Sequence, residues 1–412
     1  MRLGLLAWLG VAACYSPTIP AGAPCDPALD NCPGGQTCTT TAAGSFCGGV
    51  ESIDAAMNPD GPHPDNAPGC YGTGLVHDVC NVMGASDLDI ASNRTINTAM
   101  VGGSNCDSII AQSGGGASLC LVTARSITIA SNVKLNAIGP NPLVLVATDT
   151  IAISGTLDVA SHIAAMTPGA GAAPSCGTNG GADGSGFEAA GGGGAGGSFG
   201  TPGGNGGRGF RSSNNGSNPT PGGLALPSVA PTSLRGGCPG GDGGDADGGG
   251  GVGVGGAGGG AVYLIASAID VTGVINASGA GGGQGKDGLN ASGGAGGGGA
   301  GGFIGLDTPT LTISGAIFAN GGSGGGGGGD EPQFNGQPGK DPTSATMTTA
   351  GGDGGNGGGG DGGAGYGNGA AATNAANGSN PYCSGGGGGG AAGIIRLYGG
   401  ASPSGTFSPP AT

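Results

Sequence analysis

The sequence predicts an all-β fold: a parallel β-solenoid, or β-helix-like, body that carries long glycine-rich insertions and follows a small disulfide-rich segment. Three observations lead to this prediction. Glycine supplies 109 of the 412 residues and falls in unbroken runs, without the three-residue period of collagen. A nine-residue apolar pattern recurs in four places without gaps. Four cysteines are concentrated in a short window near the N-terminus.

The repeated unit is apolar at its first, third, seventh and ninth positions and small at its fifth. Its copies are 127–135, 151–159, 269–277 and 311–319. Side chains at alternate positions share one face of a strand, so each unit has an inward and an outward face. The fifth position holds Ser131, Gly155, Gly273 or Gly315. Because glycine inside a strand commonly marks a tight bend or a close backbone approach, we expect two short strands that meet at a corner.

A second apolar strand precedes three of the units, at 143–146, 262–265 and 303–306. A degraded copy begins at Ile394 and ends near Phe407, and a weak copy runs from Leu88 to Ile96. A unit of about twenty residues cannot bury its own apolar face, whereas stacked units share one continuous core. The sequence therefore predicts a solenoid-like body over 70–412.

Glycine-rich insertions separate the units, at roughly 161–260, 279–301 and 320–392. Ordering one backbone residue costs about 1–2 kcal/mol, with glycine at the high end, and these segments carry few side chains that would offset the cost. They must therefore stay mobile or pair backbone to backbone. Packed extended polyglycine helices are one alternative, and surface loops on one face of the solenoid are the interpretation that we favour.

The N-terminal residues have the pattern of an export signal. Arg2 precedes the apolar stretch 3–13, which is too short to span a bilayer but has the length of a signal-peptide core. The stretch ends in Val11–Cys14, which resembles the bacterial lipobox. This resemblance implies that 1–13 is a lipoprotein signal peptide and that acylated Cys14 anchors the protein to a membrane. An ordinary signal peptide that is cut near Cys14 is the alternative.

Segment 25–49 follows a short tether, 14–24, and has too little apolar surface for a core. It contains Cys25, Cys32, Cys38 and Cys47. Their gaps of six, five and eight residues are wider than those of zinc ribbons and fingers, so we predict two disulfides and leave their connectivity open. The chain has 12 cysteines, so acylation of Cys14 leaves an odd number. A linker rich in Pro and Asp, 50–69, leads to the body.

Charge and residue pattern argue against several function classes. With a net charge of −15 the chain has few basic residues for phosphate, so we expect no nucleic-acid partner. The outward repeat positions carry mainly Thr, Ser and Ala instead of the clustered acids of polysaccharide-cleaving β-helices, so we predict no enzyme and no cofactor. A partial match to calcium-binding nonapeptides makes Asp242, Asp245 and Asp247 weak calcium candidates, but we favour solvated loop aspartates over a metal site.

The lipobox, the Cys-rich segment and units of the form Ile-x-Val-Ser/Thr-Gly-x-Ile-x-Ala between glycine runs together resemble bacterial glycine-rich surface lipoproteins. The resemblance implies a lipid-anchored protein of the cell envelope, at the outer membrane or cell surface, and it transfers one functional residue, Cys14. We therefore expect a structural or adhesive lipoprotein, with surface polysaccharide or other envelope proteins as candidate partners. A carbohydrate-binding or polysaccharide-degrading β-helix protein is the alternative.

Overall fold

The structure, a computed structural model, describes most of the chain from Cys38 onward. The described residues are 38–41, 44–47, 70–77, 79–80, 86–112, 114–163, 168–172, 176–177, 180–183, 189–210, 219–228, 230–246, 251–288, 291–330, 334–399 and 404–412. The chain divides into two compact units, Met1–Pro64 and Asp65–Thr412. All regular structure in these ranges is β, without a helix. The predicted signal peptide, tether and linker lie outside them.

In the first unit the described residues form one antiparallel hairpin, β1 (Cys38–Thr41) and β2 (Gly44–Cys47). Its register places the backbone of Cys38 opposite that of Cys47. Cys25 and Cys32 lie outside the described residues, and so do the side chains of this hairpin. The two disulfides predicted for 25–49 therefore stay a prediction.

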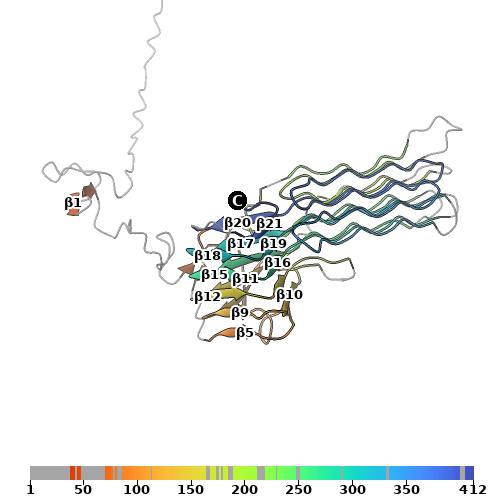
Figure 1. Cartoon of the computed structure of the whole chain (residues 1–412). Helices are drawn as coiled ribbons and strands as arrows, with labels where there is room; N and C mark the ends of the chain where they lie inside the picture. The colour runs from red at the N-terminus through yellow and green to blue at the C-terminus, as the bar shows by residue number, and fades with distance from the viewer. Residues whose placement is uncertain are drawn as a thin grey trace, which may run out of the picture. The chain divides into compact units, whose positions relative to one another are not determined.

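The second unit contains three parallel sheets, which the chain visits in a fixed order (Figure 1). Sheet 1 consists of β8 (Leu119–Ala124), β11 (Leu143–Ala147), β14 (Ala261–Ile265), β17 (Phe303–Asp307) and β20 (Ile394–Tyr398), with β7 (Ser108–Ile110) antiparallel at its edge. Sheet 2 consists of β5 (Leu88–Ile90), β9 (Ile127–Ile129), β12 (Thr150–Ile153), β15 (Ala268–Val271) and β18 (Thr310–Ile313). Sheet 3 consists of β6 (Arg94–Asn97), β10 (Lys134–Ile138), β13 (Thr156–Asp158), β16 (Val274–Asn276), β19 (Ala316–Phe318) and β21 (Thr406–Ser408).

We call these three sheets the three-sheet body. A small hairpin, β3 (Cys70–Tyr71) and β4 (Val79–Cys80), precedes them. The predicted fold class is confirmed at the level of an all-β protein with parallel sheets, an arrangement compatible with a β-helix-like body. The weak copy that begins at Leu88 and the degraded copy that begins at Ile394 both form strands that pair with the neighbouring units, at the edges of the sheets.

The core of the three-sheet body consists of ladders of aliphatic side chains. Ile153 pairs with Ile129 on one side and with Val271 on the other, and Val271 pairs with Ile313. All four side chains are buried, with at most 2% of their surface exposed. Burying one such side chain contributes about 1.5–3 kcal/mol. The prediction that these positions are equivalent in successive units is confirmed.

The corner between sheets 2 and 3 depends on glycine in three units and is built differently in the first. A Cβ on Gly273 would overlap the carbonyl oxygen of Gly155, and one on Gly315 would overlap that of Gly273. In the first unit the predicted alignment holds for 127–129 but is wrong after the corner, because Leu135 pairs with Leu157 and the corner is two residues longer. The extra residues make an exposed turn in which Asn132 has a positive φ of 61°.

The central strands of sheet 1 are buried on both faces, which explains their continuous apolar runs. One face contributes to the ladder core. The other packs in a second core that consists mainly of Val144, Val146, Tyr263, Ile265 and Phe303, with Val76, Val79, Phe199 and Leu234 from segments outside the three sheets. This second core cannot be predicted from the sequence, because its covering residues are isolated among glycines and turns.

The described residues of the glycine-rich insertions form a hydrogen-bonded, largely buried arrangement, so the favoured interpretation as surface loops was wrong for them. Each insertion leaves after a strand of sheet 3 and returns before a strand of sheet 1. Between these points the chain runs in long extended segments that lie side by side (Figure 1). We call these segments the glycine bundle. They are 189–210, 219–228, 236–246, 251–260, 277–288, 291–302, 319–330, 334–345 and 349–393.

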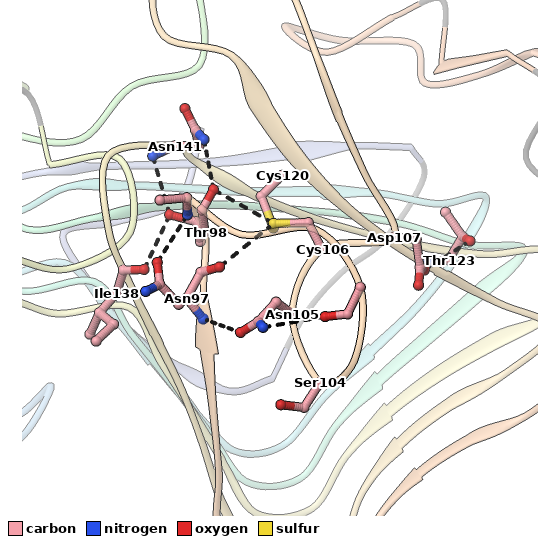
Figure 2. Close-up of a disulfide and its surroundings, with 12 residues drawn as sticks. Asn97, Thr98, Ser104, Asn105, Cys106, Asp107, Cys120, Thr123, Ile138 and Asn141 are labelled. Atoms are coloured by element: carbon pink, nitrogen blue, oxygen red, sulfur yellow. Dashed lines mark hydrogen bonds between the residues drawn. A yellow bond between two sulfur atoms is a disulfide. The ribbon is translucent and has the colours of Figure 1, made fainter.

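Two disulfides are described in the second unit, and neither pair had been assigned from the sequence. Cys106 and Cys120 join the turn before β7 to β8 (Figure 2). Cys176 and Cys238 join two segments of the first insertion across 62 residues of sequence. Cys383 is free and buried, and burial raises the pKa of its thiol to about 11, which keeps it protonated.

Candidate functional site

The glycine bundle is a lattice of backbone hydrogen bonds with a three-residue step. Along the segment that begins at residue 189, the N–H groups of Gly191, Gly194 and Gly197 donate to carbonyls of 291–302 over 2.8–3.0 Å. The carbonyls of the same three glycines accept from N–H groups of 383–393 over 2.9–3.2 Å. Each of these glycines is therefore hydrogen-bonded to two different neighbouring segments, to one through its N–H and to the other through its carbonyl. This three-fold step is that of extended helices with three residues per turn and no internal hydrogen bonds.

Burial follows the same three-residue period. The segments 291–302 and 319–329 are buried throughout, whereas along 334–345 only every third residue is buried. In the buried segments glycine is required by space rather than by backbone conformation. A Cβ on Gly297, for example, would overlap the carbonyl oxygen of Ala195. A backbone lattice this close leaves no room for side chains, and side chains therefore occur mainly at its edges.

Asn and Asp side chains terminate the lattice at its edges. The Oδ1 atoms of Asn374 and Asn377 accept from the backbone N–H groups of Asn205 and Arg208, each over 2.8 Å. Asp361 accepts from the N–H of Gly354 over 2.8 Å in the same way. Side-chain oxygens thus replace the carbonyl of a missing neighbour, which satisfies backbone groups that would otherwise lack a partner.

One of the weak calcium candidates takes part in this edge pattern, and a second makes a local contact within its own segment. Asp242 Oδ1 accepts from the N–H of Gly255 over 2.7 Å, and Asp245 Oδ1 accepts from the N–H of Ala246 over 2.8 Å. Asp247 lies outside the described residues. In the part of the chain that the structure describes, no three His, Cys, Asp or Glu side chains converge on a point that would hold a metal ion.

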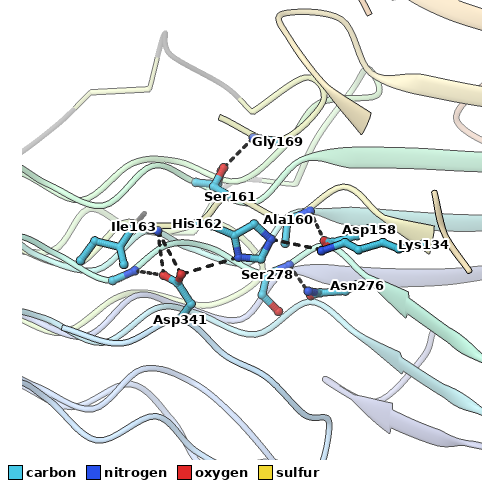
Figure 3. Close-up of polar contacts among 12 residues, drawn as sticks. Lys134, Asp158, Ala160, Ser161, His162, Ile163, Gly169, Asn276, Ser278 and Asp341 are labelled. Carbon is cyan, nitrogen blue, oxygen red and sulfur yellow. Dashed lines mark hydrogen bonds and ion pairs between the residues drawn. The ribbon is translucent and has the colours of Figure 1, made fainter. Parts of the chain in front are cut away.

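A charged cluster joins the bundle to the three-sheet body (Figure 3). Asp158 ends β13, and its carboxylate forms an ion pair with Lys134 of β10. Its Oδ2 atom also lies 3.2 Å from Nε2 of His162. On the other side of the ring, Nδ1 lies 3.6 Å from Oδ2 of Asp341, which belongs to the bundle segment 334–345. The His162 ring thus lies between a carboxylate of the body and a carboxylate of the bundle.

The carboxylates fix the protonation state of this cluster. Hydrogen bonding to Asp158, and then to Asp341, raises the pKa of His162 to about 9, so the imidazole is a cation at neutral pH. Burial alone would raise the pKa of Asp158, but hydrogen bonds from His162 and Lys134 outweigh it, and the pKa lies below its ordinary value. Both ring nitrogens face carboxylates, so the ring offers no lone pair for general-base chemistry. The arrangement fastens two parts of the chain together.

The Asp341 carboxylate also binds backbone N–H groups of two other segments. It accepts from the N–H of Gly281 over 2.8 Å and from the N–H of Ile163 over 3.0 Å. Three segments that are far apart in the sequence therefore meet at one side chain. Neither His162 nor Asp341 can be predicted as a site residue from the sequence, because their separation along the chain follows no motif.

A second buried polar cluster holds a loop against sheet 1. Asp307 accepts from the backbone N–H of Thr73 over 2.6 Å, from its hydroxyl over 2.8 Å, and from the hydroxyl of Tyr263 over 3.0 Å. Burial is the main reason that the pKa of Tyr263 is raised. A buried carboxylate with three donors is satisfied, so this cluster secures the second core and leaves no reactive group.

The lipidation candidate Cys14 lies outside the described residues. Within those residues, no helix is long and apolar enough to cross a membrane. Comparison of the chain with protein-family models, with curated proteins and with solved structures found no match.

Proposed function

We propose that the chain is a surface-anchored structural or adhesive lipoprotein of the cell envelope, without catalysis. The observation that carries this proposal is the glycine bundle. A protein that devotes much of its length to a rigid, hydrogen-bonded lattice builds an extended surface rather than a pocket around reactive groups. The resemblance to bacterial glycine-rich surface lipoproteins supports the same conclusion.

We infer that the three-sheet body is a β-solenoid. The chain passes through sheets 1, 2 and 3 in order and then begins again one strand further along each sheet. The ladder through Ile129, Ile153, Val271 and Ile313 gives the units one shared core, as stacking requires. All three insertions leave the three-sheet body at the corner between sheets 3 and 1, so the glycine bundle is attached to the body at this one corner.

The cysteine count supports the proposed anchor. With Cys14 acylated, one of the remaining cysteines must lack an intramolecular partner, and Cys383 is free and buried in the bundle. Setting both aside leaves an even number of the 12 cysteines for disulfides. Disulfides are typical of secreted and envelope proteins, which agrees with export.

The placement of acids on sheet 2 favours a non-catalytic protein over a polysaccharide-degrading one. Asp89 and Asp270 lie in the same outward ladder, with Thr128 and Ala152 between them. Three strand spacings separate the two aspartates by about 14 Å. Paired glycosidase carboxylates lie roughly 5–9.5 Å apart, so these two are too distant to act as a pair.

Metabolic labelling with an alkyne fatty acid, followed by protease treatment of intact cells, tests the proposal. We expect the wild-type chain to carry the label and to be cut by the external protease. Cys14→Ser should lose the label and accumulate as precursor, whereas the control Cys383→Ser should be labelled like the wild type. An unlabelled wild-type chain, or one that the protease reaches only after lysis, would contradict the proposed anchor or location.

A further inference from the structure

A groove runs along one edge of the glycine bundle. Its volume is about 400 Å³. It is lined by Asn205, Gly206, Arg208, Pro221, Gly222, Leu224, Asn374, Ala375 and Asn377. These residues belong to three segments, 203–210, 221–225 and 374–377. The segment 203–210 lies between the other two, since Asn205 bonds to both Asn374 and Ala225. The groove is therefore built by three bundle segments and belongs to the lattice itself.

The three asparagines of the groove have a fixed orientation. Oδ1 of each one accepts from a backbone N–H: Asn374 from Asn205, Asn377 from Arg208, and Asn205 from Ala225, all over 2.8 Å. An N–H requires an acceptor, so the amide cannot be turned around. Each Nδ2 group is left as a donor, and within the described residues none of the three has an acceptor.

Arg208 adds a cation to these donors. Its side chain is exposed, and no acid of the described residues pairs with it, although the chain carries 25 acids against 10 bases. Three-residue spacing puts Arg208 on the same side of its segment as Asn205, and Asn377 on the same side as Asn374. One turn of such a helix rises about 9 Å, so the donors form two rows with that repeat.

We propose that this groove binds a segment of an acidic polysaccharide. The side-chain donors match a ligand whose polar atoms are mostly oxygens, and a guanidinium favours a carboxylate. Pro221 and the exposed side chain of Leu224 supply an apolar wall for the C–H faces of sugar rings. An acidic peptide fits less well, because its own N–H groups need acceptors and the asparagine oxygens are already occupied. This inference rests on the adhesive role proposed above and names its ligand class.

Binding to the full mature chain in detergent, measured by calorimetry, tests this inference. The probes are a hexamer of galacturonic acid, a neutral glucose hexamer and poly-glutamate. We expect the acidic hexamer to bind more tightly than the other two, with an affinity that falls as salt rises. Binding of no hexamer, equal binding of the two hexamers, or tighter binding of poly-glutamate would overturn the inference.

Asparagine-to-aspartate variants separate ligand binding from lattice capping. Asn374→Asp together with Asn377→Asp keeps both Oδ1 acceptors, but removes two donors and adds negative charge. We expect at least a ten-fold loss of affinity with an unchanged unfolding midpoint, and Arg208→Gln should abolish the preference for the acidic hexamer. The matched control is Asn335→Asp, since Asn335 Oδ1 caps the N–H of Asp287 over 3.0 Å outside the groove. If the double variant binds as tightly as this control, the inference is wrong.

The proposed function and the proposed polysaccharide groove can be contradicted independently of each other. A wild-type chain that carries the fatty-acid label and is exposed on cells, yet binds no acidic hexamer, overturns the groove alone. A chain without label contradicts the proposed anchor, whether or not the purified protein binds sugar.

Discussion

The three-sheet body and the glycine bundle are held together in opposite ways. In the body, inward side chains at every second position form buried ladders, and apolar burial offsets the entropy of ordering the chain. In the bundle, residues at every third position exchange backbone hydrogen bonds with neighbours on several sides, and side chains are nearly absent from the interior. Removing atoms should therefore harm the body, whereas adding atoms should harm the bundle.

The largest expected effect comes from adding bulk at the centre of the bundle. Gly297→Leu would place a side chain where the backbone of Ala195 already lies. Overpacking usually costs about 1–3 kcal/mol, and here no flexible side chain can move aside, so we expect a larger loss. Thermal unfolding followed by circular dichroism measures it. The control is Ala371→Leu at an exposed edge position, and an equal effect of the two substitutions would show that the bundle is not close-packed.

Removing atoms from the body should have the next largest effect. Ile153→Ala takes away the centre of a ladder and should lower the free energy of unfolding by about 2–5 kcal/mol. Thr312→Ala, at an exposed position of the same sheet, should change it by less than about 0.5 kcal/mol. Denaturant titration of both variants compares them. If both variants unfold at the same denaturant concentration, the alternation of inward and outward faces is wrong.

A smaller effect is expected where the two regions meet. The pKa of His162 is raised to about 9 from an ordinary value of 6.5, so its charged form is stabilised by folding. Its contribution is complete below pH 6.5 and disappears as the pH rises through 9. Unfolding midpoints at pH 6 and pH 9.5 should therefore differ more for the wild type than for His162→Gln. The same pH dependence in both proteins would argue against the cluster as a fastening.

The sequence predicts the three-sheet body better than the glycine bundle, because side-chain patterns specify the body whereas backbone hydrogen bonds specify the bundle. Apolar alternation marks the ladder residues directly, and Gly273 and Gly315 mark a close backbone approach. The first unit was misaligned because the turn at Asn132 adds two residues that no apolar position reveals. Glycine runs have no pattern of side chains, so neither the lattice nor the partners of each segment can be derived from them.

The junction and the groove were beyond sequence reasoning for a related reason. His162 and Asp341 are brought together by lattice register, and so are Asn374 and Asn205. One hint was present: Asn374 and Asn377 follow each other at the three-residue spacing of the bundle. That spacing becomes informative only after the segment is known to be an extended helix with three residues per turn.

Hydrogen exchange in the glycine bundle tests most directly the claim that backbone hydrogen bonds order the insertions. Mass spectrometry of peptides from 291–302 and 383–393 should show amides protected to a degree similar to those of β14, although these peptides contain almost no side chains. Strong protection follows because their N–H groups donate to carbonyls of neighbouring segments in the buried lattice. Exchange as fast as in an unstructured peptide would contradict the claim that backbone hydrogen bonds order the insertions, and would show instead that the insertions are mobile loops.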